Sequence, residues 1–200
     1  MERSIPILVI VRDLLHLVDL GKEAKKVINE GGIIINGKIV KDYKFPCGFF
    51  DVISFPKIDK HYCVLPDSKG RLTLKEITKE NADAKLCKVK NKTIVSGGKV
   101  QLNLHDGTNL MGTNEIKTGD SIILSLKDNK ITGHYQYKPG ARAFIVGGNQ
   151  SCSIGTIKEI KKVRTSGPNT VVLQRDDGST FETVEEYVFV MSGKEESVIK

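Results

Sequence analysis

The spacing of apolar residues predicts two helices at the start of the chain. Between residues 5 and 18 the apolar positions recur every three or four residues, at Ile7, Val11, Leu14, Leu15 and Val18. This spacing places them on one helical face, and Pro6 suits the first turn, where its missing N–H is no loss. A second helix is predicted from Lys22 to Glu30, ended by Gly31-Gly32 in a left-handed conformation.

After the second helix the pattern becomes typical of strands. Ile33-Ile34-Ile35 and Lys38-Ile39-Val40 flank Asn36-Gly37, a strong signal for a two-residue hairpin turn. The next strand is expected from Phe49 to Phe55, and one later helix from Leu74 to Leu86. The remaining predicted strands are residues 61–65, 71–74, 93–95, 100–104, 122–126, 143–146, 154–157, 170–175 and 187–191.

These elements predict an α+β fold that is mostly β. A small helix-helix-hairpin domain comes first, and two small β-barrel-like domains follow, because many short strands separated by turn residues favour small barrels. We place the domains at residues 1–52, 53–131 and 132–200. No sequence period of about 20–50 residues repeats, which excludes a solenoid.

The charge pattern indicates a negatively charged binding partner. The 200 residues hold 31 Lys and Arg against 24 Asp and Glu, a formal net charge of +7, and the surplus gathers in residues 22–44, 85–99 and 138–164. Clustered cations favour a polyanion such as RNA, because neutralising phosphates releases condensed counterions. A solvated lysine-rich face explains any one cluster equally well, and residues 85–99 receive no function here.

In the first domain the lysines of the second helix lie opposite its apolar face, near a helix start that itself favours phosphate. Duplex RNA is recognised mainly through shape, 2′-OH and phosphate contacts. The alternative is a surface helix that turns lysines outward for solubility. The predicted phosphate contacts of this domain are Arg12, Lys22, Lys25, Lys26, Lys38, Lys41 and Lys44.

Catalytic and metal-binding patterns are missing from the sequence. It contains no phosphate-binding loop, no Gly-x-Ser-x-Gly and no His-Glu-x-x-His, and its four histidines are isolated. The cysteines Cys47, Cys63, Cys87 and Cys152 form no Cys-x-x-Cys pair, which indicates reduced thiols. The longest apolar stretch is interrupted by Pro6. We therefore expect a soluble intracellular protein that is not an enzyme and needs no cofactor, metal or membrane.

Residues 135–157 resemble the KOW motif of ribosomal and transcription-elongation proteins. Gly140 opens the segment, Phe144-Ile145-Val146 forms a strand, Gly147-Gly148 turns the loop and Gly155 precedes the second strand. Gly147 and Gly148 can adopt positive φ and let a nucleic-acid backbone approach. Tyr43 and Tyr137 could stack on an unpaired base, although packing explains each equally well. The predicted RNA contacts here are Lys138, Arg142, Lys158, Lys161, Lys162 and Arg164.

The order of these segments resembles the archaeal and eukaryotic small-subunit ribosomal protein S4e family, most clearly in residues 42–54 and 138–157. The resemblance implies an S4-like RNA-binding domain, a central domain and a KOW-containing SH3-like barrel. It also implies binding to ribosomal RNA and neighbouring ribosomal proteins in the cytoplasm, with no catalysis. We expect a monomer when the protein is isolated.

Two departures from the family pattern stand out. The chain opens at Met1-Glu2-Arg3 without the basic N-terminal arm of the family, and Cys152 stands where the KOW loop usually has glycine. Two other functions stay open: a KOW-type transcription-associated protein, or an RNA-modifying enzyme with an S4-like appendage. The second would need a catalytic motif in residues 53–131, where none is visible.

Overall fold

The computed structural model describes residues 4–163, 167–193 and 195–196, and these residues are mostly β, as predicted. By its internal contacts the chain separates into two units. Unit 1 comprises Met1–Leu65, Leu72–Lys85 and Ser125–Lys130; unit 2 comprises Pro66–Arg71, Leu86–Leu124 and Ile131–Lys200. The division into three domains at residues 52 and 131 stays a prediction.

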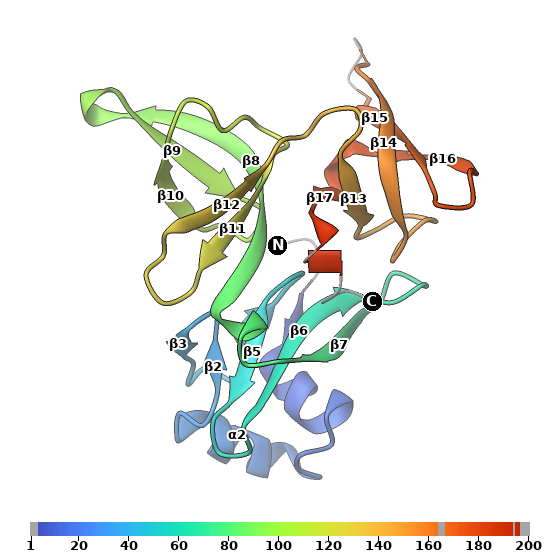
Figure 1. Cartoon of the computed structure of the whole chain (residues 1–200). Coiled ribbons are helices and arrows are strands. Elements are labelled where there is room, and N and C mark those ends of the chain that lie inside the picture. The colour runs from blue at the N-terminus through green and yellow to red at the C-terminus, as the bar shows by residue number, and fades with distance from the viewer. Residues whose placement is uncertain (1–3, 164–166, 194, 197–200) are drawn as a thin grey trace. The chain divides into compact units, whose positions relative to one another are not determined.

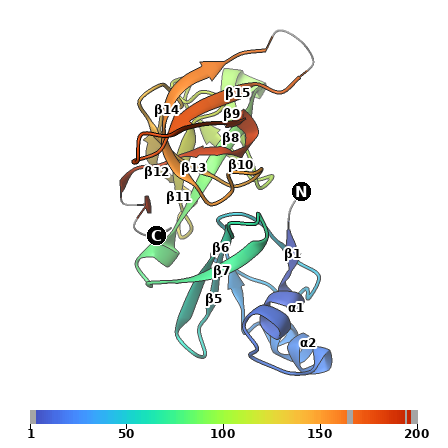
Figure 2. The same ribbon diagram turned by 90° about the vertical axis from the view of Figure 1, so that its right-hand side faces the viewer.

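Unit 1 packs two short helical segments against one sheet. β1 (Ile5–Pro6) pairs with β4 (Pro46–Cys47), and α1 (Ile7–Val9) runs directly into the π-helical segment η1 (Ile10–Leu14). α2 (Gly21–Asn29) lies beside α1 (Figure 2). The sheet has the order β3-β2-β5-β6-β7. Its strands are β2 (Ile34–Ile35), β3 (Lys38–Ile39), β5 (Val52–Phe55), β6 (Lys60–Pro66) and β7 (Leu72–Ile77).

The first predicted helix is shorter than the apolar spacing suggested. Residues 5 and 6 pair with β4 instead, and the helical part ends after Leu14 in a wide turn, where the N–H of Leu15 donates to the carbonyl of Ile10 at 3.0 Å. Such π-helical turns often occur at functional sites. The second helix ends as predicted, because Gly31 has φ 76° and its N–H donates to the carbonyl of Ile28 at 3.0 Å.

The predicted hairpin turn is confirmed. Asn36 and Gly37 have φ 49° and 76°, the two left-handed residues that this kind of turn requires. A Cβ atom on Gly37 would lie 2.6 Å from the carbonyl oxygen of Leu126, so packing also demands glycine there. The hairpin thus meets the requirements of both the local turn and the surrounding unit.

The core of unit 1 joins the helices to the sheet through buried apolar side chains. These include Ile7, Ile10, Val11, Ala24, Ile28, Ile33, Ile35, Ile53 and Val64.

The helix predicted from Leu74 to Leu86 is wrong. This segment contains β7, the 3-10 turn η2 (Asn81–Asp83) and the start of β8 (Ala84–Val95). Leu72 and Leu74 alternate along a strand that packs on this core, which outweighs the weak helical spacing.

Unit 2 contains two five-stranded sheets, with the orders β10-β9-β8-β11-β12 and β16-β15-β14-β13-β17 (Figure 1). The first adds to β8 the strands β9 (Lys99–Leu104), β10 (Asn109–Gly112), β11 (Ser121–Ser125) and β12 (Ile131–Tyr135). The second contains β13 (Arg142–Ile145), β14 (Ile154–Lys161), β15 (Thr170–Gln174), β16 (Thr180–Val184) and β17 (Val188–Val190). Sequence reasoning missed β10, β12 and β16.

Polar contacts join the two sheets of unit 2. Ser121 Oγ accepts the N–H of Val190 at 2.9 Å, and the Asp120 carboxylate accepts the N–H of Tyr137 at 2.8 Å. Both Ser121 and Asp120 are buried, so these bonds replace water at polar groups that would otherwise lose hydration. The bond to Val190 therefore connects β11 of the first sheet with β17 of the second.

The described residues contain neither a membrane-crossing helix nor a cluster of metal-ligating side chains. No helix there has the length and apolar character that a membrane crossing requires. Within the same residues no group of three His, Cys, Asp or Glu side chains could hold a metal ion. No disulfide joins the four cysteines, all of which lie in the described residues, and Cys47, Cys63 and Cys87 are buried. Burial raises the pKa of the Cys63 thiol to about 12, which makes it an unreactive packing group.

Candidate nucleic-acid interface

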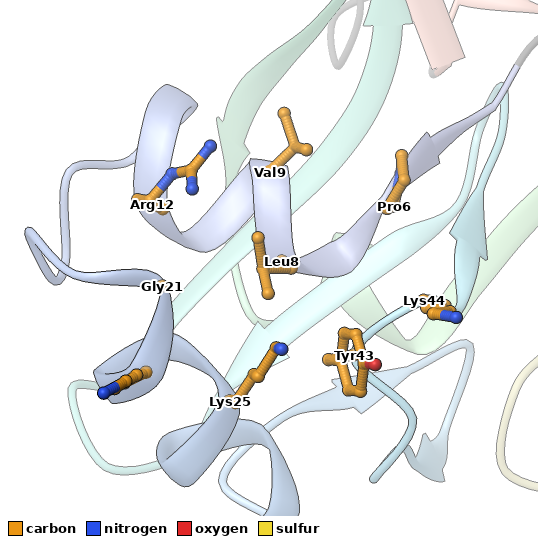
Figure 3. Close-up of a pocket in the computed structure, with 9 residues that line it drawn as sticks. Pro6, Leu8, Val9, Arg12, Gly21, Lys25, Tyr43 and Lys44 are labelled. Carbon is orange, nitrogen blue, oxygen red and sulfur yellow. The ribbon is translucent and has the colours of Figure 1, made fainter.

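Five of the residues predicted to bind RNA line one pocket of unit 1. The pocket has a volume of about 560 Å³ and is lined by Pro6, Leu8, Val9, Arg12, Gly21, Lys22, Lys25, Tyr43 and Lys44 (Figure 3). Four of these side chains carry positive charge and one is a tyrosine, while three are apolar. The tertiary structure therefore brings together cations that are up to 32 positions apart in the sequence, from Arg12 to Lys44.

Three chain segments position the pocket side chains. α1 and η1 supply Leu8, Val9 and Arg12, and the first turns of α2 supply Lys22 and Lys25. The segment that carries Tyr43 is tied to α1 by backbone hydrogen bonds. The N–H of Leu8 donates to the carbonyl of Tyr43 at 3.2 Å, and the N–H of Ile7 donates to the carbonyl of Phe45 at 2.9 Å. These bonds fix the Tyr43 backbone beside the start of α1.

Tyr43 is surrounded by positive charge. The Nζ atom of Lys25 lies 4.5 Å from the centre of the Tyr43 ring, and that of Lys44 lies 5.8 Å from it. An ammonium group over an aromatic face is attracted by the ring's negative quadrupole. Tyr43 is half-buried, and both lysines are exposed. An anion at this place would therefore meet two exposed ammonium groups beside the ring.

Arg12 has an acidic partner that sequence reasoning missed. Its Nε and Nη2 atoms lie 2.6 Å and 2.8 Å from the two carboxylate oxygens of Asp13. Hydrogen bonding to Arg12 lowers the pKa of Asp13 below its ordinary value. Because both groups are solvent-exposed, the pair contributes little to stability, but it competes with any phosphate for the guanidinium.

Three of the predicted first-domain contacts do not line the pocket. Lys26 is exposed on α2, and Lys38 is exposed on β3. Lys41 is exposed near the opposite end of α2, where its Cε atom lies 3.5 Å from the place that a Cβ of Gly31 would occupy. These lysines extend the positive surface of the unit beyond the pocket.

Unit 2 carries a second group of predicted contacts around β14. Lys158 is exposed at a β-bulge between Ile157 and Glu159, and Lys162 is exposed just beyond the strand. Lys161 is paired with Glu182 at 3.2 Å, and Lys138 donates to Gln136 at 3.1 Å. Arg164 lies outside the described residues.

Arg142 and Tyr137 are engaged within unit 2. The Arg142 guanidinium contacts the carboxylates of Asp176 at 2.5 Å and Glu196 at 3.0 Å, and these hydrogen bonds raise its pKa. The Tyr137 side chain packs against the core of the second sheet, and burial raises the pKa of its hydroxyl. Their prediction as RNA contacts gains no support from these contacts.

The glycine-rich loop of unit 2 is built as its sequence suggests, with one exception. Gly148 is exposed and has φ 78°, as the sequence suggests, whereas Gly147 is buried, and its prediction as an RNA contact gains no support from this position. Cys152, at the position where the KOW loop usually has glycine, adopts φ 64°. This left-handed conformation costs a residue with a side chain about 1–2 kcal/mol. The structure therefore retains the glycine-like backbone although the residue is cysteine.

The lysine-rich window of residues 85–99 is partly explained by the fold. In unit 1, Lys85 forms a buried ion pair with Asp51 at 2.7 Å. In unit 2, Lys88 donates to the backbone carbonyls of Glu185 at 2.6 Å and Glu186 at 3.3 Å, and burial lowers its pKa to about 8. Two lysines of this window, to which the sequence assigned no function, thus make structural contacts.

Comparison with known proteins agrees with this arrangement. The S4 domain family model matches residues 21–53, which include Lys22, Lys25, Tyr43 and Lys44 of the pocket, and the model of Ribosomal family S4e matches residues 58–131. Two curated archaeal relatives are named small ribosomal subunit protein eS4. The relative from Archaeoglobus fulgidus is 48% identical over 194 residues, which cover 97% of this chain and 81% of the relative. The relative from Methanothermobacter thermautotrophicus is 46% identical over 198 residues, which cover 99% of this chain and 81% of the relative.

A solved structure supports the same assignment. The crystal structure of the 30S ribosomal protein S4e from Thermoplasma acidophilum superposes with a TM-score of 0.81 at 34% identity, covering 97% of this chain and 98% of that one. The resemblance read from residues 42–54 and 138–157 is therefore confirmed, as is the mostly-β fold class. The chain belongs to the ribosomal protein S4e family.

Proposed function

We propose that this chain is a structural constituent of the small ribosomal subunit that binds ribosomal RNA through the pocket surface of unit 1. The observation that carries the proposal is the convergence of Arg12, Lys22, Lys25, Lys44 and Tyr43 on one pocket. Lysines that are neighbours in the sequence can serve solubility, but cations that three separate segments bring to one pocket offer RNA phosphates a concentrated positive charge.

A second surface in unit 2 extends the contact with RNA. Lys138, Lys158 and Lys162 are exposed near the glycine-rich loop, and they supply phosphate contacts that need no base sequence. Neighbouring ribosomal proteins are the other partners. A small-subunit ribosomal protein works on ribosomes in the cytoplasm, and it requires no catalytic group.

The two alternative functions lose their support. The relatives that cover nearly all of this chain are named as small-subunit ribosomal proteins, not as transcription factors or RNA-modifying enzymes. The central segment, where a catalytic motif would be required, matches the ribosomal S4e family instead.

The test reverses three charges of the α2 surface in the full chain. Lys22, Lys25 and Lys26 become Glu in one variant, and Lys57, Lys79 and Lys130 become Glu in the control. The control lysines are exposed residues of the same unit that do not line the pocket. Binding to small-subunit RNA is titrated over a salt series, and co-sedimentation with small subunits is measured alongside.

The α2 variant should weaken RNA binding and reduce the slope of log affinity against log salt concentration by about 2, since each lost phosphate contact lowers it by about 0.7–0.9. The control should change affinity less, through the general loss of charge. Equal affinity and equal slope for the two variants would contradict the proposed contact surface.

A further inference from the structure

We propose that the pocket between α1, α2 and Tyr43 holds one unpaired nucleotide of the bound RNA. Its base would lie against Tyr43 and the apolar wall, and its two flanking phosphates would meet the cations at the rim. The inference rests on the proposed RNA-binding function and specifies which form of RNA this surface recognises.

The chemistry of the pocket wall carries the first step. Pro6, Leu8 and Val9 form an apolar wall beside Tyr43. A surface that bound only phosphates would need positive side chains, but it would not need an apolar pocket wall. Nucleobases have flat faces that stack on aromatic rings regardless of sequence. A volume of about 560 Å³ lies within the range of about 300–1,000 Å³ for pockets that hold small ligands.

The geometry of duplex RNA carries the second step. In a paired helix the faces of the bases are covered by their neighbours, and a protein reaches only edges, 2′-hydroxyls and phosphates. A base can lie against Tyr43 and Leu8 only when it is turned out of the helix, as in a bulge, a loop or a junction. The apolar wall therefore selects unpaired nucleotides over continuous duplex.

Tyr43 and Lys25 can exchange partners when the base enters. Backbone bonds to α1 hold Tyr43 in place, and Lys25 Nζ covers its ring at 4.5 Å in the free protein. Figure 3 shows the Lys25 side chain extending from α2 toward the tyrosine. The lysine is exposed and has a flexible stem. The base takes the ammonium's place on the ring, and the ammonium pairs with a phosphate of the same nucleotide.

The cations are distributed to meet phosphates on both sides of a bound nucleotide. Arg12 and Lys22 come from η1 and α2, whereas Lys44 follows Tyr43 in the chain. In Figure 3 Arg12 and Lys44 lie on opposite sides of Leu8. An RNA strand that inserts one base between them passes its 5′ and 3′ phosphates over the two sides of the rim.

The experiment compares two RNA hairpins that differ by one bulged nucleotide. The full chain is titrated with the bulged hairpin and with the same hairpin fully paired. Tyr43→Leu removes the flat ring and keeps an apolar side chain, and Tyr43→Phe keeps the ring as the matched control. Lys22→Glu tests the phosphate contribution to both RNAs. In a separate measurement on the unaltered protein, 2-aminopurine occupies the bulge or a paired position, and its fluorescence reports stacking.

The unaltered protein and Tyr43→Phe should bind the bulged hairpin about 5-fold to 150-fold more tightly than the paired one, the range that corresponds to about 1–3 kcal/mol for one stacked base. Tyr43→Leu should remove this preference and leave the affinity for paired RNA unchanged. The fluorescence of bulged 2-aminopurine should change on binding, and that of the paired one should not.

The failures of the two proposals are distinguishable. If both hairpins bind equally and Lys22→Glu weakens both, the nucleotide pocket is refuted and RNA binding stands. If the bulged 2-aminopurine keeps its fluorescence in the complex, the pocket is refuted in the same way. If neither hairpin nor small-subunit RNA binds at low salt, the proposed function fails and the pocket inference fails with it.

Discussion

Replacing Lys85 by methionine should destabilise unit 1 strongly, although lysine-to-methionine changes are usually mild at surfaces. Lys85 Nζ lies 2.7 Å from Asp51 Oδ1, and the two side chains are 1% and 4% exposed. The Asp51 carboxylate also accepts the N–H of Gly48 at 2.7 Å and the Nδ2 group of Asn36 at 2.8 Å. Lys85→Met leaves a buried carboxylate with those two donors and without its counter-charge.

The magnitude follows from this arrangement. Removing one partner of a buried ion pair costs about 3–5 kcal/mol, and the two remaining donors place Lys85→Met at about 3 kcal/mol in the free energy of unfolding. Asp51→Asn alone should also destabilise, because it removes the carboxylate that pairs with the buried Lys85 ammonium. The double variant should cost less than the sum of the single changes, since it removes both buried charges together.

Chemical unfolding of the full chain in urea, at neutral pH, measures these changes. Lys127→Met is the matched control, because Lys127 pairs with Asp83 at 2.6 Å in the same unit while the two side chains are 69% and 49% exposed. That exposed pair should contribute less than about 1 kcal/mol. A Lys85→Met variant that loses no more stability than Lys127→Met would refute the reasoning that burial makes this lysine structural.

Three further predictions concern single side chains. In the folded chain burial lowers the pKa of Lys88 from 10.5 to about 8. Between these two pH values the unfolded chain therefore binds one more proton than the folded chain. The free energy of unfolding should rise with pH across this range, by on the order of 3 kcal/mol. Urea unfolding at pH 8 and 10 should show a smaller rise for Lys88→Met. Cys152→Gly should stabilise the fold by about 0.5–1 kcal/mol by relieving the positive φ, measured as a higher thermal midpoint, whereas Cys152→Ala should give no gain. Asp13→Asn should increase RNA affinity severalfold at low salt, because it releases Arg12 from its carboxylate partner; an unchanged affinity would exclude Arg12 as a phosphate contact.

Local features of the fold were predictable because local sequence causes them. The end of α2 follows from the freedom of Gly31 to adopt positive φ, and the hairpin follows from Asn36-Gly37. The predicted strands were found for the same reason, since β-branched residues bounded by turn residues need no distant information. Residues 74–86 are different, because their weak helical spacing predicted a helix. Leu72 and Leu74 contact the distant core of unit 1, and these contacts favour a strand instead.

The candidate site was predictable in residue type and only partly in position. Sequence reasoning found Arg12, Lys22, Lys25, Tyr43 and Lys44, but it could not separate them from Lys85 or Arg142, which have equal charge and different surroundings. It also missed the apolar wall of Pro6, Leu8 and Val9, because apolar residues at helical spacing look like core. No local sequence signal distinguishes apolar residues that line a pocket from apolar residues that pack in the core.

The sequence by itself determined the second helix, the Asn36-Gly37 hairpin, most strands and the surplus of positive charge, because each depends on residues close together in the chain. Only the tertiary structure decided which cations stay in water and which are buried. Lys85 meets Asp51 from 34 positions away, whereas Lys25 and Lys44 each approach the ring of Tyr43 and remain exposed. The cost of removing a charge from water depends on the whole surrounding unit, and that environment exists only once the chain has folded.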